Sequence, residues 1–267
     1  MYLGIQTYTV RDTMTDLAGV KKTIAQLHDI GFRNLHTGTP QFMKPQEYKD
    51  LLDSFGMAAL SVSGPEDPQQ IAPSIPDIEA QLKIFGVKLV DIPTLPSAFR
   101  NTAQGYETYA KQLNAGGKAL YEACGGVPAY HNHALEFISL GDGLCGMDIL
   151  LEQTDPKYVS LILDTHWLAS GGKNPPDYIH KCAGRITIMH FKDYAIDPDA
   201  SFIEAVPRIF AEVGQGNLDW PAIVAACKDA DVTICVSEQD ICKGASIDSA
   251  RISYNGMVRL GLEAKRI

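Results

Sequence analysis

The feature that most constrains the fold is an alternation along the whole chain between short apolar runs rich in β-forming residues and longer amphipathic stretches. The apolar runs are mostly continuous, as expected for parallel strands that are covered on both faces. We therefore predict eight strands, at Leu3–Tyr8, Asn34–Thr37, Ala59–Val62, Leu89–Ile92, Ala129–His131, Val159–Leu163, Ile186–His190 and Thr233–Ser237.

Helices are predicted between these strands. The segment Leu17–Ile30 has apolar residues at helical spacing, with Asp16 as its N-cap and Gly31 directly after it. The Pro-rich segment 65–77 is predicted to be a loop that leads into a helix ending near Phe85. Further helices are predicted at Tyr106–Cys124, Asp177–Cys182, Trp220–Ala230 and Ser246–Leu260.

Strands that alternate with helices in this way predict an α/β fold, a single (β/α)₈ TIM barrel. The chain has 267 residues, which is a usual length for such a barrel, and no low-complexity linker divides it. We therefore expect one domain over residues 1–267. The alternative is a doubly wound open sheet, but Thr7-Tyr8-Thr9-Val10 is not the Gly-rich phosphate loop that such a sheet normally has after its first strand.

Composition excludes several classes of protein. The net charge of -9 argues against a nucleic-acid-binding protein, which usually has a basic patch. No apolar run approaches the roughly 20 residues needed to cross a membrane, and no targeting segment precedes the first strand. The six cysteines form no CxxC motif, so we expect reduced cysteines in a cytoplasmic protein. Homo-oligomers are common, but no sequence feature specifies an interface.

Ionisable residues of metal-ligand type follow the last four predicted strands. In a TIM barrel the catalytic face is built from the carboxyl ends of the strands and the loops after them. Burying such groups without partners costs several kcal/mol each, and a shared metal ion offsets that cost. The stretches are His131-Asn132-His133 with Glu136, Asp164-Thr165-His166-Trp167, His190-Phe191-Lys192-Asp193, and Glu238-Gln239-Asp240.

A metal centre is the interpretation that explains these residues together. Each acid taken singly could be an ion-pair partner or a helix cap, and His190 could be a core histidine, but four candidates at four consecutive strand ends favour a metal. We predict one divalent ion bound by Glu136, Asp164, His190 and Glu238. Carboxylates with one imidazole suit Mn²⁺ best, with Co²⁺, Mg²⁺ and Zn²⁺ as alternatives.

These four stretches resemble the sugar phosphate isomerase/epimerase family, which is the xylose-isomerase-like TIM barrel superfamily that includes ketose 3-epimerases and inosose dehydratases. The resemblance covers the C-terminal half, whereas the N-terminal half adds only Gly4-Ile5-Gln6-Thr7-Tyr8 and the barrel rhythm. It implies that Glu136 and Glu238 are both metal ligands and catalytic residues, which exchange a proton of a small polyhydroxylated substrate from opposite faces. Metal binding of the neighbouring oxygens would stabilise the enediolate formed.

Other residues are expected around this metal. His131, His133 and His166 are candidates for substrate binding or for orienting the glutamates, with structural hydrogen bonding as the alternative. Trp167 is a candidate wall for a sugar ring or a core residue, and Lys192 could bind a substrate oxygen or pair with Asp240, itself a substrate-binding candidate. Weaker candidates for the pocket are Tyr8, Arg11, His36, Asp91 and Phe137.

The sequence departs from the ketose 3-epimerases at two points. In those enzymes a histidine follows the aspartate by three residues, whereas here His166 follows Asp164 by two. They also have an arginine shortly after the metal histidine, and here the first arginine after His190 is Arg208. A metal-dependent sugar isomerase or epimerase is the first hypothesis, and a dehydratase or lyase on a keto-sugar or inosose is the alternative. No phosphate-binding cluster is evident.

Two rival classes remain. A phosphodiesterase similar to endonuclease IV uses the same barrel with several zinc ions, but it would need further ligands and a basic DNA-facing surface. A non-catalytic carbohydrate-binding subunit would keep the pocket without turnover. The intact set of acids argues against that role.

Overall fold

The predicted strands form one parallel sheet that curves into a nearly closed barrel. The computed structural model describes residues 1–199 and 208–267. The strand order is β3-β2-β1-β11-β8-β7-β6-β5-β4, so β1 pairs with β11 from the far end of the chain. The barrel strands are β1 (Tyr2–Gln6), β2 (Asn34–His36), β3 (Ala58–Ala59), β4 (Val62–Ser63), β5 (Leu89–Ile92), β6 (Val127–His131), β7 (Ser160–Asp164), β8 (Ile186–Phe191) and β11 (Ile234–Ser237).

The third predicted strand is interrupted. It is observed as β3 and β4, with Leu60 and Ser61 between them, and these two short pieces are the edges of the sheet. With β3 and β4 counted as one position, the barrel has the eight strand positions that the sequence predicts.

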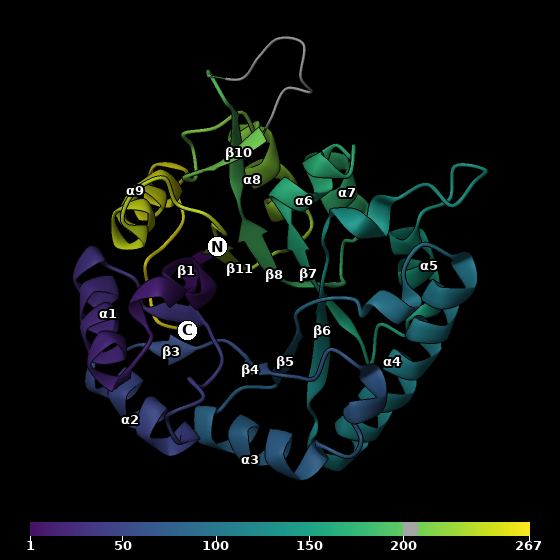
Figure 1. The fold of residues 1–267 in the computed structure, drawn as a ribbon, viewed down its shortest axis with the longest axis horizontal. Helices are drawn as coiled ribbons and strands as arrows, with labels where there is room; N and C mark the ends of the chain where they lie inside the picture. The colour runs from purple at the N-terminus through teal and green to yellow at the C-terminus, as the bar shows by residue number, and fades with distance from the viewer. Residues whose placement is uncertain (200–207) are drawn as a thin grey trace.

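Helices cover the outside of the barrel, as Figure 1 shows. The first helix, α1 (Leu17–Ile30), has the predicted bounds, and the Asp16 carboxylate caps it by accepting from the Gly19 N–H at 2.7 Å. The other helices are α2 (Pro45–Ser54), α3 (Ile75–Phe85), α4 (Ala103–Cys124), α5 (Gly146–Gln153), α6 (Thr165–Ser170), α7 (Pro175–Lys181), α8 (Trp220–Asp229) and α9 (Ser246–Arg259). Short 3₁₀ turns are η1 (Thr7–Thr13), η2 (Pro68–Gln70), η3 (Ser97–Phe99) and η4 (Ala134–Phe137).

Several elements were not predicted. The helices α2, α5 and α6 are short, and α6 starts directly at the end of β7 because the Asp164 carboxylate caps it through the Trp167 N–H. An antiparallel hairpin of β9 (Asp193–Ile196) and β10 (Arg208–Ala211) stands apart from the barrel sheet (Figure 1). Apolar periodicity is clear only over longer segments. It therefore does not predict the four-residue strands β9 and β10.

Two apolar cores position the site. The larger core lies between strands and helices, and a small inner core of Leu60, Ala129, Ile162, Ile188 and Val236 is separate from it. Because side chains alternate along a strand, the residues two positions after four of these inner residues also point into the barrel. Those residues are His131, Asp164, His190 and Glu238.

The remaining predictions about composition can be checked against the described residues. All six cysteines are free, as expected from the sequence. Among the helices of residues 1–199 and 208–267, none is long and apolar enough to cross a membrane.

Candidate metal centre

Four donor side chains meet at the carboxyl end of the barrel. His131, Asp164, His190 and Glu238 each offer one ligand atom, and these atoms all lie within 4.8 Å of one another. All four residues are buried, and they come from the ends of β6, β7, β8 and β11. They form a layer directly above the inner core, so the barrel geometry itself brings them together.

The contacts within this layer leave polar atoms without partners. His190 Nδ1 lies 2.8 Å from Glu238 Oε2 and 4.0 Å from Asp164 Oδ2, and His131 Nε2 lies 3.7 Å from Asp164 Oδ2. Neither His131 Nε2 nor Asp164 Oδ2 has a hydrogen-bond partner among the described residues. A buried polar atom without a partner costs about 1–3 kcal/mol. These residues therefore fit a bound cation, which would satisfy both atoms.

Lys192 is a buried cation beside the layer. Its ammonium is buried, lies 3.8 Å from Asp164 Oδ2 and 3.4 Å from Glu238 Oε2, and contacts Asp240 Oδ2. Three carboxylates against one ammonium leave an excess of negative charge. Burial alone would lower the pKa of His131, but Asp164 and Glu238 raise that pKa above its usual value. A bound cation would offset this excess.

The protonation states of His190 and Glu238 suit a metal, because ligands must be deprotonated to bind one. Burial lowers the pKa of His190 to about 3, so this histidine is neutral at physiological pH. Burial alone would raise the pKa of Glu238, but Lys192 and His190 hold that pKa well below its usual value. Burial raises the pKa of Asp164, and Lys192 opposes this rise.

Glu136 lies outside the group of four donors, although it was predicted to be a ligand. It is fully buried in η4, where one carboxylate oxygen accepts from the Tyr130 hydroxyl and the other from the His133 N–H at 2.8 Å. Tyr130 belongs to the outer core and packs against Tyr109 of α4. The fourth member of the group of donors is His131, which was predicted to bind substrate, and metal binding by Glu136 stays a prediction.

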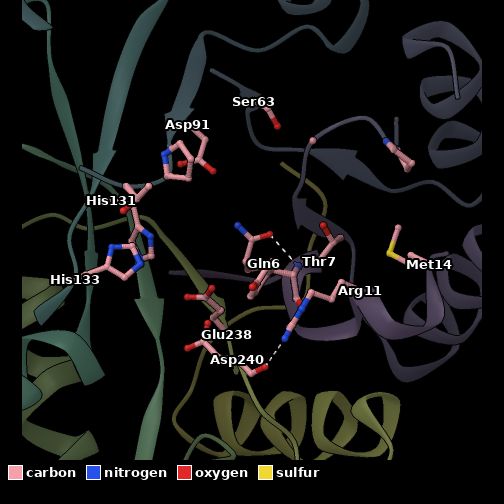
Figure 2. A pocket seen from close by; sticks show the side chains of 15 residues that line it. Gln6, Thr7, Arg11, Met14, Ser63, Asp91, His131, His133, Glu238 and Asp240 are labelled. Carbon is pink, nitrogen blue, oxygen red and sulfur yellow. Dashed lines mark hydrogen bonds between the residues drawn. The ribbon is translucent and has the colours of Figure 1, made fainter. Parts of the chain in front are cut away.

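A cavity of about 480 Å³ opens over the layer (Figure 2). Of the predicted site residues, His131, His133, Asp240 and Glu238 line it, and so do the weaker candidates Tyr8, Arg11 and Asp91. His133 lies beside His131, with ring centroids 4.7 Å apart, and burial lowers the pKa of His133 to about 3. A neutral imidazole at this position can donate or accept a hydrogen bond from a substrate hydroxyl.

The other predicted substrate-binding residues lie next to the layer. His166, Trp167 and Lys192 are not among the described residues that line the cavity. The Lys192 ammonium lies 4.5 Å from the centroid of the Trp167 ring, and the rings of His166 and Trp167 are 4.7 Å apart. Burial lowers the pKa of His166 to about 4, so this side chain is a neutral part of an aromatic cluster.

The opposite wall of the cavity was largely missed from the sequence. It is formed by residues that follow β1, β2, β4 and β5, and Figure 2 shows Gln6, Thr7 and Arg11 facing His131 and His133 across the opening. These residues also follow strand ends, which is the signal that could have identified them. Most are uncharged, so a search for ligand-type residues passes over them. The wall comprises Gln6, Thr7, Met14, Gly38, Pro40, Ser63, Pro93 and Thr94.

Asp193 fixes the end of β8 to the loop that follows the hairpin. Its carboxylate accepts from the backbone N–H of Gly214, Gly216 and Leu218 and, at 2.6 Å, from the Trp220 indole. A Cβ at Gly216 would lie 2.4 Å from this carboxylate, so the close approach needs glycine there. This anchor explains the Gly-rich run 212–220 and keeps Lys192 next to the layer.

The chain is similar in sequence to several inosose dehydratases. It is 33% identical over 122 residues to that of Geobacillus kaustophilus, covering 42% of this chain and 39% of the relative. It is 28% identical over 166 residues to inosose dehydratase 2 of Bacillus cereus, covering 57% of this chain and 53% of the relative. The matched part thus spans about half of these relatives or less. No family model matches the chain.

Solved structures match over nearly the whole chain. A sugar phosphate isomerase/epimerase from Parabacteroides distasonis superposes with a TM-score of 0.77 at 19% identity, covering 95% of this chain and 92% of that one. An L-ribulose 3-epimerase gives 0.72 at 15% identity, covering 98% and 95%. An IolI protein with a bound zinc atom gives 0.72 at 16% identity, covering 97% and 98%.

The resemblance predicted from the strand-end motifs is confirmed by both comparisons. The identities to the solved structures are low, so these matches establish the fold. The chain thus has the TIM-barrel fold of solved sugar phosphate isomerases/epimerases and of a xylose isomerase domain protein, and part of its sequence is similar to inosose dehydratases.

Proposed function

We propose that the chain is a divalent-metal-dependent enzyme that removes the proton beside the carbonyl of a small polyhydroxylated ketone and expels a β-hydroxyl as water. The observation that carries the proposal is the buried layer of His131, Asp164, His190 and Glu238, two of whose members, His131 and Glu238, line a 480 Å³ cavity. The similarity to inosose dehydratases supports the same class of reaction.

The donor set suggests which ions would bind. Two imidazoles and two carboxylates are one nitrogen richer than the predicted set, and they suit Mn²⁺, Co²⁺ and Zn²⁺. When bound, such an ion supplies a Lewis-acidic charge that polarises substrate oxygens. The zinc atom of the IolI neighbour supports metal use, and Mn²⁺ remains the predicted ion for this chain.

Glu238 is the proposed base. The described polar contacts of its carboxylate go to Oε2, which lies near His190 Nδ1 and Lys192 Nζ, and this leaves Oε1 for the substrate. Because Lys192 and His190 hold the pKa of Glu238 low, the carboxylate is ionised, as a base must be before it takes a proton. In the proposed elimination it takes the proton from the α-carbon and returns it to the departing hydroxyl, so the products are water and an unsaturated ketone.

The position of Glu136 favours elimination over epimerisation. Epimerisation at one carbon needs two acid–base groups on opposite faces of the substrate, which the resemblance assigned to Glu136 and Glu238. The Glu136 carboxylate is engaged by Tyr130 and the His133 N–H, whereas elimination needs one carboxylate only. An isomerase or epimerase is the second candidate, and it would have to use another group of the cavity.

The cavity favours an uncharged substrate. Its ionisable walls include the carboxylates of Asp91, Glu238 and Asp240, whereas the guanidinium of Arg11 already donates to the carbonyl oxygens of Tyr8 and Asp240. Carboxylates accept hydrogen bonds from hydroxyl groups and repel phosphate. We therefore propose an inosose or keto-sugar without a phosphate group.

The proposal is tested by a screen of inososes and keto-sugars in deuterated water with Mn²⁺, Co²⁺, Mg²⁺ or Zn²⁺ added. Loss of 18 mass units with absorbance of an unsaturated ketone is the expected result. Deuterium uptake without dehydration would instead favour the epimerase. Activity that survives complete removal of metal would overturn both.

The rival classes are distinguished by metal counting and by binding. Three zinc ions per chain would indicate the phosphodiesterase, although one such donor group is found among residues 1–199 and 208–267. Sugar binding without any proton exchange would indicate a carbohydrate-binding subunit.

A further inference from the structure

The nitrogen of His190 that faces away from the four-donor layer contacts a second buried histidine. His190 Nε2 lies 2.9 Å from His36 Nδ1 at the end of β2, and each side chain is 1% exposed. The same His36 Nδ1 is 3.2 Å from the side-chain amide nitrogen of Gln6 at the end of β1. On the other side of the ring, His36 Nε2 lies 3.4 Å from Asp91 Oδ2 of β5, its nearest acidic neighbour, without an aligned hydrogen bond among the described residues.

The amide of Gln6 determines which of these atoms donate. Gln6 Oε1 accepts from the Tyr8 N–H at 3.2 Å, so the amide nitrogen, which can only donate, is the atom that faces His36. His36 Nδ1 must then be an acceptor, which places the ring proton on Nε2, toward the Asp91 carboxylate. His190 Nε2 faces the same acceptor, so it carries the proton of its own ring.

This assignment leaves the Nδ1 lone pair of His190 free and directed at the layer. His190 Nδ1 and Glu238 Oε2 are 2.8 Å apart, and with Glu238 ionised both atoms are acceptors. A cation between them would remove the repulsion.

We propose that Gln6, His36 and Asp91 form a positioning relay that holds His190 in the tautomer whose Nδ1 can bind metal. The inference rests on the proposed metal-dependent function and adds three residues from the N-terminal half of the barrel to it. The relay reaches the cavity, because Asp91 lines it and its Oδ1 has no partner among the described residues. It also gives a role to Gln6 within the Gly4-Ile5-Gln6-Thr7-Tyr8 motif.

The sharpest test is Gln6→Glu, which changes a donor into an acceptor without changing the shape of the side chain. An added carboxylate near a cation would by Coulomb attraction alone strengthen metal binding. The relay instead predicts weaker metal binding by this variant. A carboxylate at residue 6 draws the His36 proton to Nδ1, which leaves His190 Nε2 without an acceptor and puts the proton on His190 Nδ1.

The expected outcome is a 10–100-fold weaker Kd for Co²⁺ and Zn²⁺ in calorimetric titrations of the full chain, the range found when a partner of a metal ligand is lost. Gln104→Glu on the exposed face of α4 is the matched control for the added charge, and it should leave the Kd unchanged. Unchanged or tighter binding by Gln6→Glu would overturn the relay.

A second pair of variants and a second measurement keep the test independent of folding and of activity. His36→Asn retains an acceptor and should bind metal better than His36→Leu, and equal binding by the two contradicts the relay. In the metal-free chain, ¹⁵N NMR should show His190 protonated on Nε2 in wild type and on Nδ1 in Gln6→Glu. A wild-type Nδ1 proton would refute the relay, whereas failure of wild type to bind any metal would refute the proposed function.

Discussion

Glu136 and Glu238 are both buried glutamates that follow a barrel strand, but their surroundings differ. Glu136 accepts from a tyrosine hydroxyl and a backbone N–H beside the outer core, and Glu238 lies in the inner layer with Lys192 and His190. Glu238 comes two residues after the inward Val236, whereas Glu136 lies in η4, beyond the end of β6. Strand register thus places Glu238 in the inner layer and Glu136 outside it.

The largest effect that tests this contrast is expected from Glu238→Gln. Loss of the base should lower kcat by 10²–10⁴-fold, and loss of a charged ligand should weaken metal binding. Glu136→Gln should bind metal like wild type, because Gln can accept from the His133 N–H and donate to the Tyr130 oxygen. Steady-state kinetics and calorimetry measure both variants, and equal losses would show that the contrast between the two glutamates is not functional.

Metal removal should produce the next largest effect. Metal held at 100 times its Kd stabilises a protein by about 2.7 kcal/mol, which for a chain of this size corresponds to roughly 5–10 °C in Tm. A chelator should therefore lower the Tm of wild type and of Glu136→Gln by this amount, as measured by differential scanning calorimetry. The Tm of Glu238→Gln should respond little, and a full response there would exclude Glu238 as a ligand.

Tyr130→Phe tests the surroundings of Glu136 in the comparison with Glu238. It removes the hydroxyl that donates to Glu136 and leaves a buried carboxylate oxygen without that partner. The free energy of unfolding should fall by about 1–3 kcal/mol, as measured by urea denaturation. Metal affinity should stay at the wild-type value, since Tyr130 lies outside the layer. A parallel loss of metal binding would mean that Glu136 and the layer are coupled.

The smallest effect concerns how stability depends on pH in the metal-free chain, where the contributions of Glu136 and Glu238 should change in opposite directions. Burial raises the pKa of Glu136 above 4.5, so its contribution to stability is present below pH 4.5 and is lost as the pH rises through the folded-state pKa. The pKa of Glu238 is held below 4.5 by Lys192 and His190 against the effect of burial, so its contribution is lost as the pH falls below 4.5.

Urea denaturation of each Glu→Gln variant beside wild type, from pH 2 to pH 8, measures these two contributions. Each slope is at most about 1.4 kcal/mol per pH unit. Slopes of the same sign for Glu136→Gln and Glu238→Gln would contradict the assigned environments.

Much of the fold could be predicted because the barrel strands are continuous apolar runs. Asp164, His190 and Glu238 were found together because each ends or directly follows such a run, where the next inward position meets the cavity. The choice between His131 and Glu136 could not be made in the same way. It depends on which side Ala129 faces and on where the chain leaves β6, and both are set by tertiary packing.

The pairing of β1 with β11 has a consequence for how the protein matures. Arg11 donates to the Asp240 carbonyl across 229 residues of sequence, and Glu238 follows the last barrel strand. Closing a chain segment of that length costs about 5 kcal/mol of entropy, which the paired strands must offset together. We therefore expect the nascent chain to gain its binding site only after β11 has left the ribosome. Metal should then bind only when synthesis of the chain is almost finished.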